Sequence, residues 1–351
     1  MRVLYPVLAL ALAFPALAAA ESTKTMEEST AEVPAAGVST VVVSNPRGRV
    51  LVRRGAGPGI RLRALKIARG SDARSRQRMS DETHVLTSRE GSRWSVRVNY
   101  PDRQQYRVTF WDLMNGHEVQ RVSVELEIDV PPGIALDLKS ASGDLETEGI
   151  AADQTLETSS GDIEVRSAGR VMLEAASGDA TVLGLSAGHL RVQSGDLRVQ
   201  NVTGPLDART SSGDLTVGDA GDSLVLETVS GDLEVDRAPA GIRATSTSGE
   251  IEVSRARGRV DLESVSGGIH ATLERGTVAA HLETSSGDIR VRLAGLPCEL
   301  DAQTSSGDIE TAVAMQIREV TRRRVAGRVG SGDTPVRLRT SSGDIDVAEG
   351  E

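Results

Sequence analysis

Residues 284–289 read Thr-Ser-Ser-Gly-Asp-Ile, and this stretch decides the fold of the 351-residue chain. The same six residues recur at 158–163, 304–309 and 340–345. Shorter copies fill the intervals, so that the motif serines are Ser142, Ser160, Ser177, Ser194, Ser212, Ser230, Ser286, Ser306 and Ser342, with a Glu variant at Ser248 and a Gly variant at Ser266. Successive motif glycines from Gly143 to Gly307 are 17 to 20 residues apart. Such a period indicates a stacked repeat array.

Aliphatic and polar residues alternate on both sides of each motif. Four residues before the serine stand residues such as Leu156 and Leu282, and three after it stand Ile163 and Ile289. Period-two alternation predicts strands with one buried face, and Gly-Asp suits a tight bend between two strands. We therefore expect an all-β fold, a single-stranded parallel β-helix (β-solenoid) of about 18-residue rungs, right-handed because parallel crossovers are. Residues one repeat apart should be vertical neighbours, and strand parity points the motif serine inward.

The two ends of the chain differ from the repeats. Arg2, the apolar run Val3 to Leu17 and Ala18-Ala19-Ala20 are typical of a secretory signal cleaved after Ala20. The predicted location of the mature protein is therefore periplasmic or extracellular, and no membrane span is expected after cleavage. The predicted divisions are a signal peptide at 1–20, a flexible linker at 21–36, an irregular N-terminal β-region or cap with an aromatic insertion at 37–133, the solenoid at 134–347 and an acidic tail at 348–351.

Charge and cysteine content exclude some function classes. The formal net charge is −10, and residues 131–351 carry 21 basic against 36 acidic side chains. Nucleic-acid binding depends on basic groups that neutralise phosphates, so a nucleic-acid partner is not expected. The lone cysteine, Cys298, cannot form an internal disulfide and is expected to be a buried small hydrophobe.

The motif aspartates should form a column at the bends. Its members are Asp144, Asp162, Asp179, Asp196, Asp214, Asp232, Asp288, Asp308 and Asp344, with Glu250 in the same position. Like charges on adjacent strands, about 4.8 Å apart, repel. Either bend amides hold each carboxylate, which is the structural interpretation we adopt, or calcium bridges neighbouring rungs. No catalytic, cofactor-binding or metal-binding residue is assigned, and the five histidines show no metal-ligand spacing.

The aromatic residues of the mature chain are confined to one short stretch. They are Trp94, Tyr100, Tyr106, Phe110 and Trp111, and none follows Trp111. Exposed, they would make a partner-binding patch; buried, they would form the small core of the cap or insertion. The solenoid itself offers no aromatic ring to a sugar.

The Thr-Ser-Ser-Gly-Asp-Ile copies resemble the bacterial toastrack family, also described as adhesin-like β-strand-repeat domains of unknown function. Two further features match it: the segment Asn45-x-x-Gly48 and the ending Gly327-Arg328-Val329-Gly330 followed by the last motif. The resemblance spans roughly Val38 to Val347. It implies a right-handed single-stranded β-helix in an envelope setting, linked to adhesion or envelope-stress sensing, with no agreed active site.

Three functions are compatible with these observations. We expect a non-catalytic, exported envelope scaffold or adhesin-like protein that binds a protein or envelope polymer. The alternative is an accessory partner in envelope-stress sensing. A carbohydrate-active enzyme on a β-helix is the least favoured, because such enzymes break the coil with loops that bring acids or bases together, whereas here the charged residues follow the repeat.

Overall fold

A computed structural model describes residues 24–70, 72–101 and 121–350. The chain divides into two compact units, residues 1–168 and 169–351, which are described separately. Within the described residues there are 27 strands and one helix, so the all-β prediction is confirmed. The one helix within the described residues is not long and apolar enough to cross a membrane.

Unit 1 contains the helix and the first strands. Its elements are β1 (Lys24–Pro34), β2 (Thr40–Arg47), β3 (Val50–Arg54), β4 (Gly59–Arg69), α1 (Ala73–Glu82), β5 (His84–Glu90), β6 (Arg93–Asn99), β7 (Arg121–Val130), β8 (Ala135–Ser142), β9 (Leu145–Glu148), β10 (Gln154–Ser160) and the start of β11 (Ile163–Ser177).

The strands of unit 1 form stacked rungs closed by antiparallel strands. On one side the order is β5-β6-β2-β8-β10, and only the β5–β6 pair is antiparallel. On the other side the order is β1-β4-β7-β3-β9-β11, in which β1–β4 and β4–β7 are antiparallel. The rung made by β2 and β3 therefore lies between β6/β7 and β8/β9, although it precedes both in the chain.

Two predictions for this region are wrong. Residues 24–34, expected in a flexible linker, form β1 and pair along their whole length with β4. The N-terminal region, expected to be irregular, contains a full rung at residues 40–54. Strand β1 satisfies the backbone groups of the otherwise open edge of β4, and β2 and β3 each pair with strands on both sides. Helix α1 begins after Asp72, whose carboxylate accepts hydrogen bonds from the Arg74 and Ser75 amides.

Unit 2 is a longer series of rungs. After the end of β11 it contains β12 (Ala180–Ser194), β13 (Leu197–Val202), β14 (Leu206–Ser212), β15 (Leu215–Asp219), β16 (Leu224–Ser230), β17 (Leu233–Arg237), β18 (Ile242–Ser248), β19 (Ile251–Ser266), β20 (Ile269–Ser286), β21 (Ile289–Ala294), β22 (Cys298–Ser306), β23 (Ile309–Ala312), β24 (Met315–Thr321), β25 (Arg324–Val329), β26 (Thr334–Ser342) and β27 (Ile345–Glu349).

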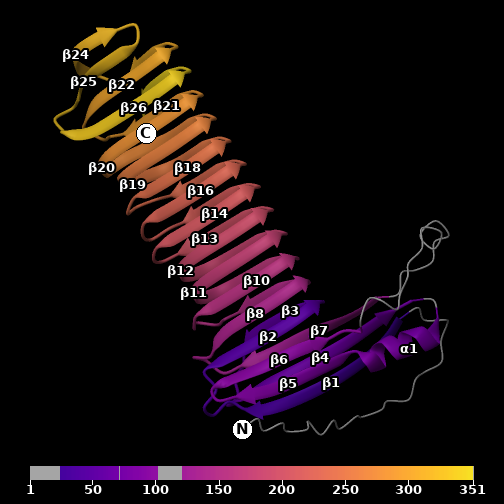
Figure 1. The fold of residues 1–351 in the computed structure, drawn as a ribbon. Helices are drawn as coiled ribbons and strands as arrows, with labels where there is room; N and C mark the ends of the chain where they lie inside the picture. Colours follow the sequence, from indigo (N-terminus) through magenta and orange to yellow (C-terminus); the bar gives the residue numbers. More distant parts are fainter. Residues whose placement is uncertain (1–23, 71, 102–120, 351) are drawn as a thin grey trace. The chain divides into compact units, whose positions relative to one another are not determined.

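The repeats of unit 2 stack in register, as predicted. The motif serines pair along the parallel ladder as Ser194–Ser212, Ser212–Ser230, Ser230–Ser248, Ser248–Ser266 and Ser266–Ser286. Figure 1 shows these strands side by side from β12 to β26. The aliphatic columns lie inside; Leu190, Leu226 and Leu282, for example, are at most 1% exposed. The solenoid prediction is therefore confirmed for these rungs.

The last two repeats do not follow chain order. Strand β26 lies between β20 and β22, and β27 lies between β21 and β23. Ser342 therefore stands between Ser286 and Ser306 in the stack. The expectation that successive repeats are vertical neighbours is wrong at this end. The β24–β25 hairpin (Figure 1) covers β22 with an antiparallel strand. Residues 348–349, expected in an acidic tail, belong to β27.

Candidate functional site

The motif aspartates are held by backbone amides of neighbouring rungs. In unit 1 the amide of Asp162 donates to Oδ1 of Asp144 over 3.0 Å. In unit 2 the same bond, at 2.8 to 3.0 Å, joins the pairs Asp196–Asp179, Asp214–Asp196, Asp232–Asp214, Glu250–Asp232, Asp344–Asp288 and Asp308–Asp344, each written amide first. Seven carboxylates of the column thus accept a main-chain donor, which is the kind of bond that the structural interpretation requires.

The hydroxyl column differs from the prediction. The motif serines are exposed, and the buried hydroxyls belong to the residues two positions earlier, such as Thr210, Thr284 and Thr340. Thr284 Oγ1 donates to the Gly267 carbonyl over 3.0 Å, and Thr340 Oγ1 donates to that of Gly287 over 3.1 Å. The strict alternation ends before the bend, because the chain turns outward at the motif serine to form it.

The predicted aromatic patch does not include Trp94, which is 2% exposed in the core of unit 1. Tyr100 is partly buried; its hydroxyl donates to Asn45 Oδ1 over 2.9 Å and accepts from the Val124 amide over 3.1 Å. Burial raises the pKa of Tyr100 well above its usual value. Trp94 and Tyr100 therefore pack in the N-terminal region and are not part of an exposed patch. Tyr106, Phe110 and Trp111 lie outside the described residues.

Asn45 and Gly48, which the resemblance singled out, tie the first rung to β7. Asn45 is fully buried and donates through Nδ2 to the Val124 carbonyl over 2.7 Å and to that of Gly48 over 3.1 Å. Gly48 has a φ of +96°, and a Cβ there would lie 2.4 Å from the Val124 oxygen. The bend of this rung therefore requires both residue types.

The outward side chains of unit 2 form two long surfaces. We call face A the outward side chains of the strands that lead into the motif bend, and face B those of the strands that follow it. On face A, the column three residues before the serine reads, in spatial order, Arg191, Arg209, Glu227, Thr245, Glu263, Glu283, Arg339 and Gln303. The column five residues before the motif serine reads, in the same order, His189, Asp207, Val225, Arg243, Asp261, His281, Arg337 and Asp301.

Ion pairs join neighbouring rungs on face A. Arg209 of β14 lies 2.8 Å from Glu227 of β16, and Arg339 of β26 lies 2.6 Å from Asp301 of β22. Arg209 also lies 3.1 Å from Asp207 on its own strand. Between these pairs a hollow spans several rungs, because the short Thr245 stands between longer glutamates. It is lined by carboxylates and hydroxyls together with an exposed valine: Glu227, Thr245, Thr247, Glu263, Val265, Glu283 and Ser285.

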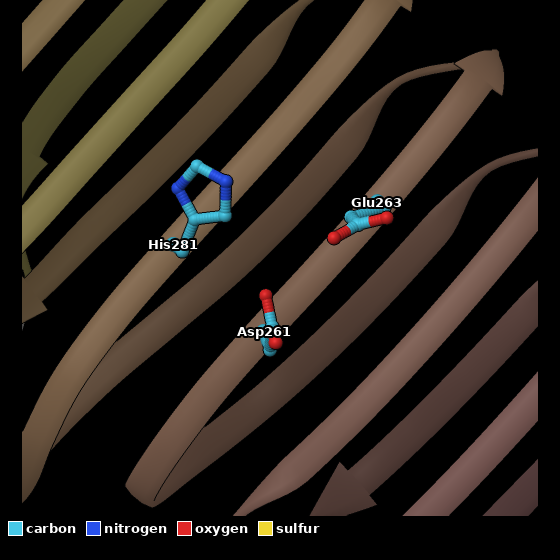
Figure 2. A group of neighbouring side chains, drawn as sticks. All are labelled: Asp261, Glu263 and His281. Atoms are coloured by element: carbon cyan, nitrogen blue, oxygen red, sulfur yellow. The ribbon is translucent and has the colours of Figure 1, made fainter.

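One group of face A brings metal-ligating atoms together. Ligand atoms of Asp261, Glu263 and His281 all lie within 4.8 Å of one another. Figure 2 shows Asp261 and Glu263 on one strand and His281 on the next, with all three side chains on the same face. Glu283 adjoins them, with its Oε2 3.2 Å from His281 Nε2.

The sequence prediction missed this group because it compared the histidines only with one another. The available signal was the repeat itself. When the 20-residue offset between Gly267 and Gly287 is applied, His281 aligns with Asp261 and Glu283 aligns with Glu263.

Cys298 is fully buried on β22. Burial raises the pKa of its thiol to about 11, so the thiol is protonated at neutral pH and is a poor nucleophile.

Comparison with known proteins gives a family and some distant structural likenesses. The model of the family Toastrack DUF4097 matches residues 79–258 and 242–348. No curated protein matches the chain. Similar solved structures include a "putative cell adhesion protein" from Clostridium sporogenes, at 8% identity and a TM-score of 0.22, covering 93% of this chain and 100% of that chain. A "putative adhesin" from Bacteroides fragilis has 11% identity and a TM-score of 0.29, covering 92% and 97%. A "putative lipid binding protein" from Parabacteroides distasonis has 12% identity and a TM-score of 0.24, also covering 92% and 97%.

Proposed function

Because the chain belongs to the Toastrack family, we propose that it is an exported, non-catalytic, adhesin-like scaffold of the cell envelope. In this proposal a signal peptide at 1–20 is removed after Ala20, and the protein acts in the periplasm or outside the cell. The solenoid is right-handed, as parallel crossovers are. Its partner is another protein or an envelope polymer, bound through face A.

The observation that carries this proposal is the register of face A. Rungs about 4.8 Å apart repeat the same outward positions from β12 to β26, so that charged groups and hydroxyls stand in columns. Such a surface suits an extended partner, because many weak contacts along one rigid axis add up to useful affinity. The hollow around Glu263 and Val265 adds depth to this surface.

The solvent-exposed apolar residues of face A support a binding role. Val225, Val229 and Val265 are 42%, 47% and 55% exposed, and they stand among hydroxyls and carboxylates. Apolar groups with a polar surround are what a protein partner uses for its central contacts. The ion pair between Arg209 and Glu227 joins two neighbouring rungs, and this structural use of charge favours a scaffold over an enzyme.

Site-specific photocrosslinking in intact cells tests the proposed face. A photoreactive phenylalanine analogue replaces Val229 or Val265 on face A. In the matched controls it replaces Glu234 or Glu252, exposed residues of face B in the same series of rungs. We expect a discrete adduct from the face A positions only. Equal adducts from both faces, or none from face A, would overturn the proposal, and a membrane regulator as the captured partner would support the envelope-stress alternative.

Export is tested separately by cell fractionation and amino-terminal sequencing. We expect the chain outside the cytoplasm with Glu21 as its first residue. A cytoplasmic chain that keeps residues 1–20 would contradict the envelope role without affecting the description of face A.

A further inference from the structure

Two adjacent strands of face A place four potential metal ligands in a square. On the parallel ladder between β19 and β20, Asp261 pairs with His281 and Glu263 pairs with Glu283. Residues two apart on a strand point to the same side, and the strands are about 4.8 Å apart. All four side chains therefore project from one patch of unit 2.

The distances suit a small divalent cation. A tetrahedral zinc site with bonds of about 2.0–2.2 Å separates its ligand atoms by roughly 3.3–3.6 Å. His281 Nε2 and Glu283 Oε2 are already 3.2 Å apart, and the atoms of Asp261, Glu263 and His281 lie within 4.8 Å of each other. Glu263 is exposed, so its side chain is free to change rotamer and approach the other ligands.

The local charges leave room for a cation. Arg243 lies 3.0 Å from Asp261 and neutralises that carboxylate in part. Arg337 and Arg339 stand on the next strand, beside His281 and Glu283, but Arg339 is engaged by Asp301 at 2.6 Å. Among the described residues, Glu263 has no hydrogen bond or ion pair, although it faces Glu283 across the ladder. A divalent ion between them converts this repulsion into attraction.

The donor set favours zinc over calcium and magnesium. Calcium and magnesium prefer oxygen ligands only, whereas one imidazole with carboxylates suits zinc. We propose that Asp261, Glu263 and His281, with Glu283 beside them, form a zinc-binding site on the outer face of the solenoid. Glu263 and Glu283 also line the hollow of face A, but the zinc site needs side chains of this chain alone, so zinc binding can be tested without the partner and can fail separately from partner binding.

Calorimetric titration of the full chain with zinc chloride, in a buffer that does not bind metals, tests the proposal. We expect one site per chain. His281→Gln and Glu263→Gln should each weaken binding at least about tenfold, because each removes a ligand. All the ligands are outward, so these variants should keep the circular dichroism spectrum of the parent. Absence of binding by the parent, or unchanged affinity in both variants, would overturn the site.

The chain supplies a matched control in the same column. His189 also pairs with an aspartate, Asp207, at 3.3 Å on face A. The neighbouring column there holds Arg191 and Arg209 where the proposed site has two glutamates. His189→Gln should therefore leave zinc affinity unchanged. A loss of affinity in this variant equal to that of His281→Gln would mean that zinc binds histidines nonspecifically.

Two more variants assign the ligands. Arg243→Gln should tighten binding, because it frees the Asp261 carboxylate; no tightening would remove Asp261 from the site. Cys298→Ser should leave binding unchanged, since that thiol is buried on β22; a loss of binding in this variant would place the zinc at the thiol and overturn the proposal. Cobalt substitution gives a second readout, because its visible spectrum reports coordination directly.

Discussion

The glycine of each motif is required by the spacing between rungs. In unit 2, a Cβ on Gly213 would lie 2.1 Å from the carbonyl oxygen of Gly195, and a Cβ on Gly231 would lie 2.2 Å from that of Gly213. Gly213 also has a φ of +127°, which L side chains rarely adopt. Close approach and backbone conformation therefore both exclude any other residue at this bend.

Gly213→Ala should accordingly destabilise the protein strongly. The steric overlap with a rigid backbone carbonyl and the unfavourable φ together cost about 2–4 kcal/mol. Urea unfolding followed by circular dichroism measures the change. Gly218→Ala is the control, because the nearest atom to its Cβ is in the flexible side chain of Gln200, at 3.3 Å. A loss for Gly213→Ala no larger than that of the control would refute the steric explanation.

The sequence predicted the residues of the bend better than their directions. Gly and Asp were assigned to it correctly, because their conformational and hydrogen-bonding roles are local. The motif serine was placed inward by counting alternate residues, but the buried hydroxyl is that of Thr284, two positions before Ser286. Alternation holds only while the strand continues, and a one-dimensional pattern does not show the residue at which the strand ends.

Strands β22, β25 and β26 meet at a single carboxylate. Asp301 on β22 accepts hydrogen bonds from Arg339 of β26 over 2.6 Å and from Arg324 of β25 over 3.1 Å. The hydrogen bond from Arg339 is the largest cause that lowers the pKa of Asp301, ahead of that from Arg324. This residue therefore links the inserted strand β26 and the β24–β25 hairpin to the terminal rung of β22 and β23.

Asp301→Asn should destabilise the protein in a pH-dependent manner. Because the pKa is lower in the folded than in the unfolded state, the carboxylate stabilises the fold above its unfolded pKa, and this contribution is lost as the pH falls through the folded value. We expect a loss of about 1–2 kcal/mol at pH 7, shrinking as the pH is lowered below about 4. Urea unfolding of the parent and the variant at pH 7 and at a pH below about 4 measures the loss of stability.

Asp346→Asn is the control for this experiment, since Asp346 is exposed on β27 in the same rung as Arg339. It should change stability little at either pH. A loss for Asp301→Asn that stays constant down to acidic pH would show that packing, and not the charge, is responsible.

The position of β26 could not be predicted from the sequence. Its motif, Thr340 to Ile345, is the same as that at 304–309, so identical residues fit either order of stacking. What decides the order is the β24–β25 hairpin, which reverses the chain and covers β22. Gly307 and Gly343 are 36 residues apart, which is twice the 18-residue repeat, so the spacing does not show that the following rung returns between two earlier ones.

Unit 2 as a whole is a one-dimensional stack, in which each rung contacts only its neighbours. In such arrays stability is roughly the sum of rung and interface terms. Interior rungs are therefore nearly interchangeable, whereas the rung of β26 and β27 joins chain segments that are not consecutive. The terminal rung of β22 and β23 depends on it for its parallel partner strands.

Two deletions of equal length distinguish these roles. Deleting residues 214–231 removes one interior repeat and joins Gly213 to Asp232, so that the motif register is kept. Deleting residues 334–351 removes β26 and β27. We expect the first variant to unfold cooperatively at a slightly lower urea concentration. In the second, β22 and β23 lose their parallel partners, and cleavage within residues 298–333 should be at least about tenfold faster, because proteolysis follows the population of the open form. Limited proteolysis with mass spectrometry measures both variants. Equal protection of this segment in the two proteins would mean that β22 and the hairpin hold their place without the inserted rung, and that the end of the stack is stabilised by the hairpin alone.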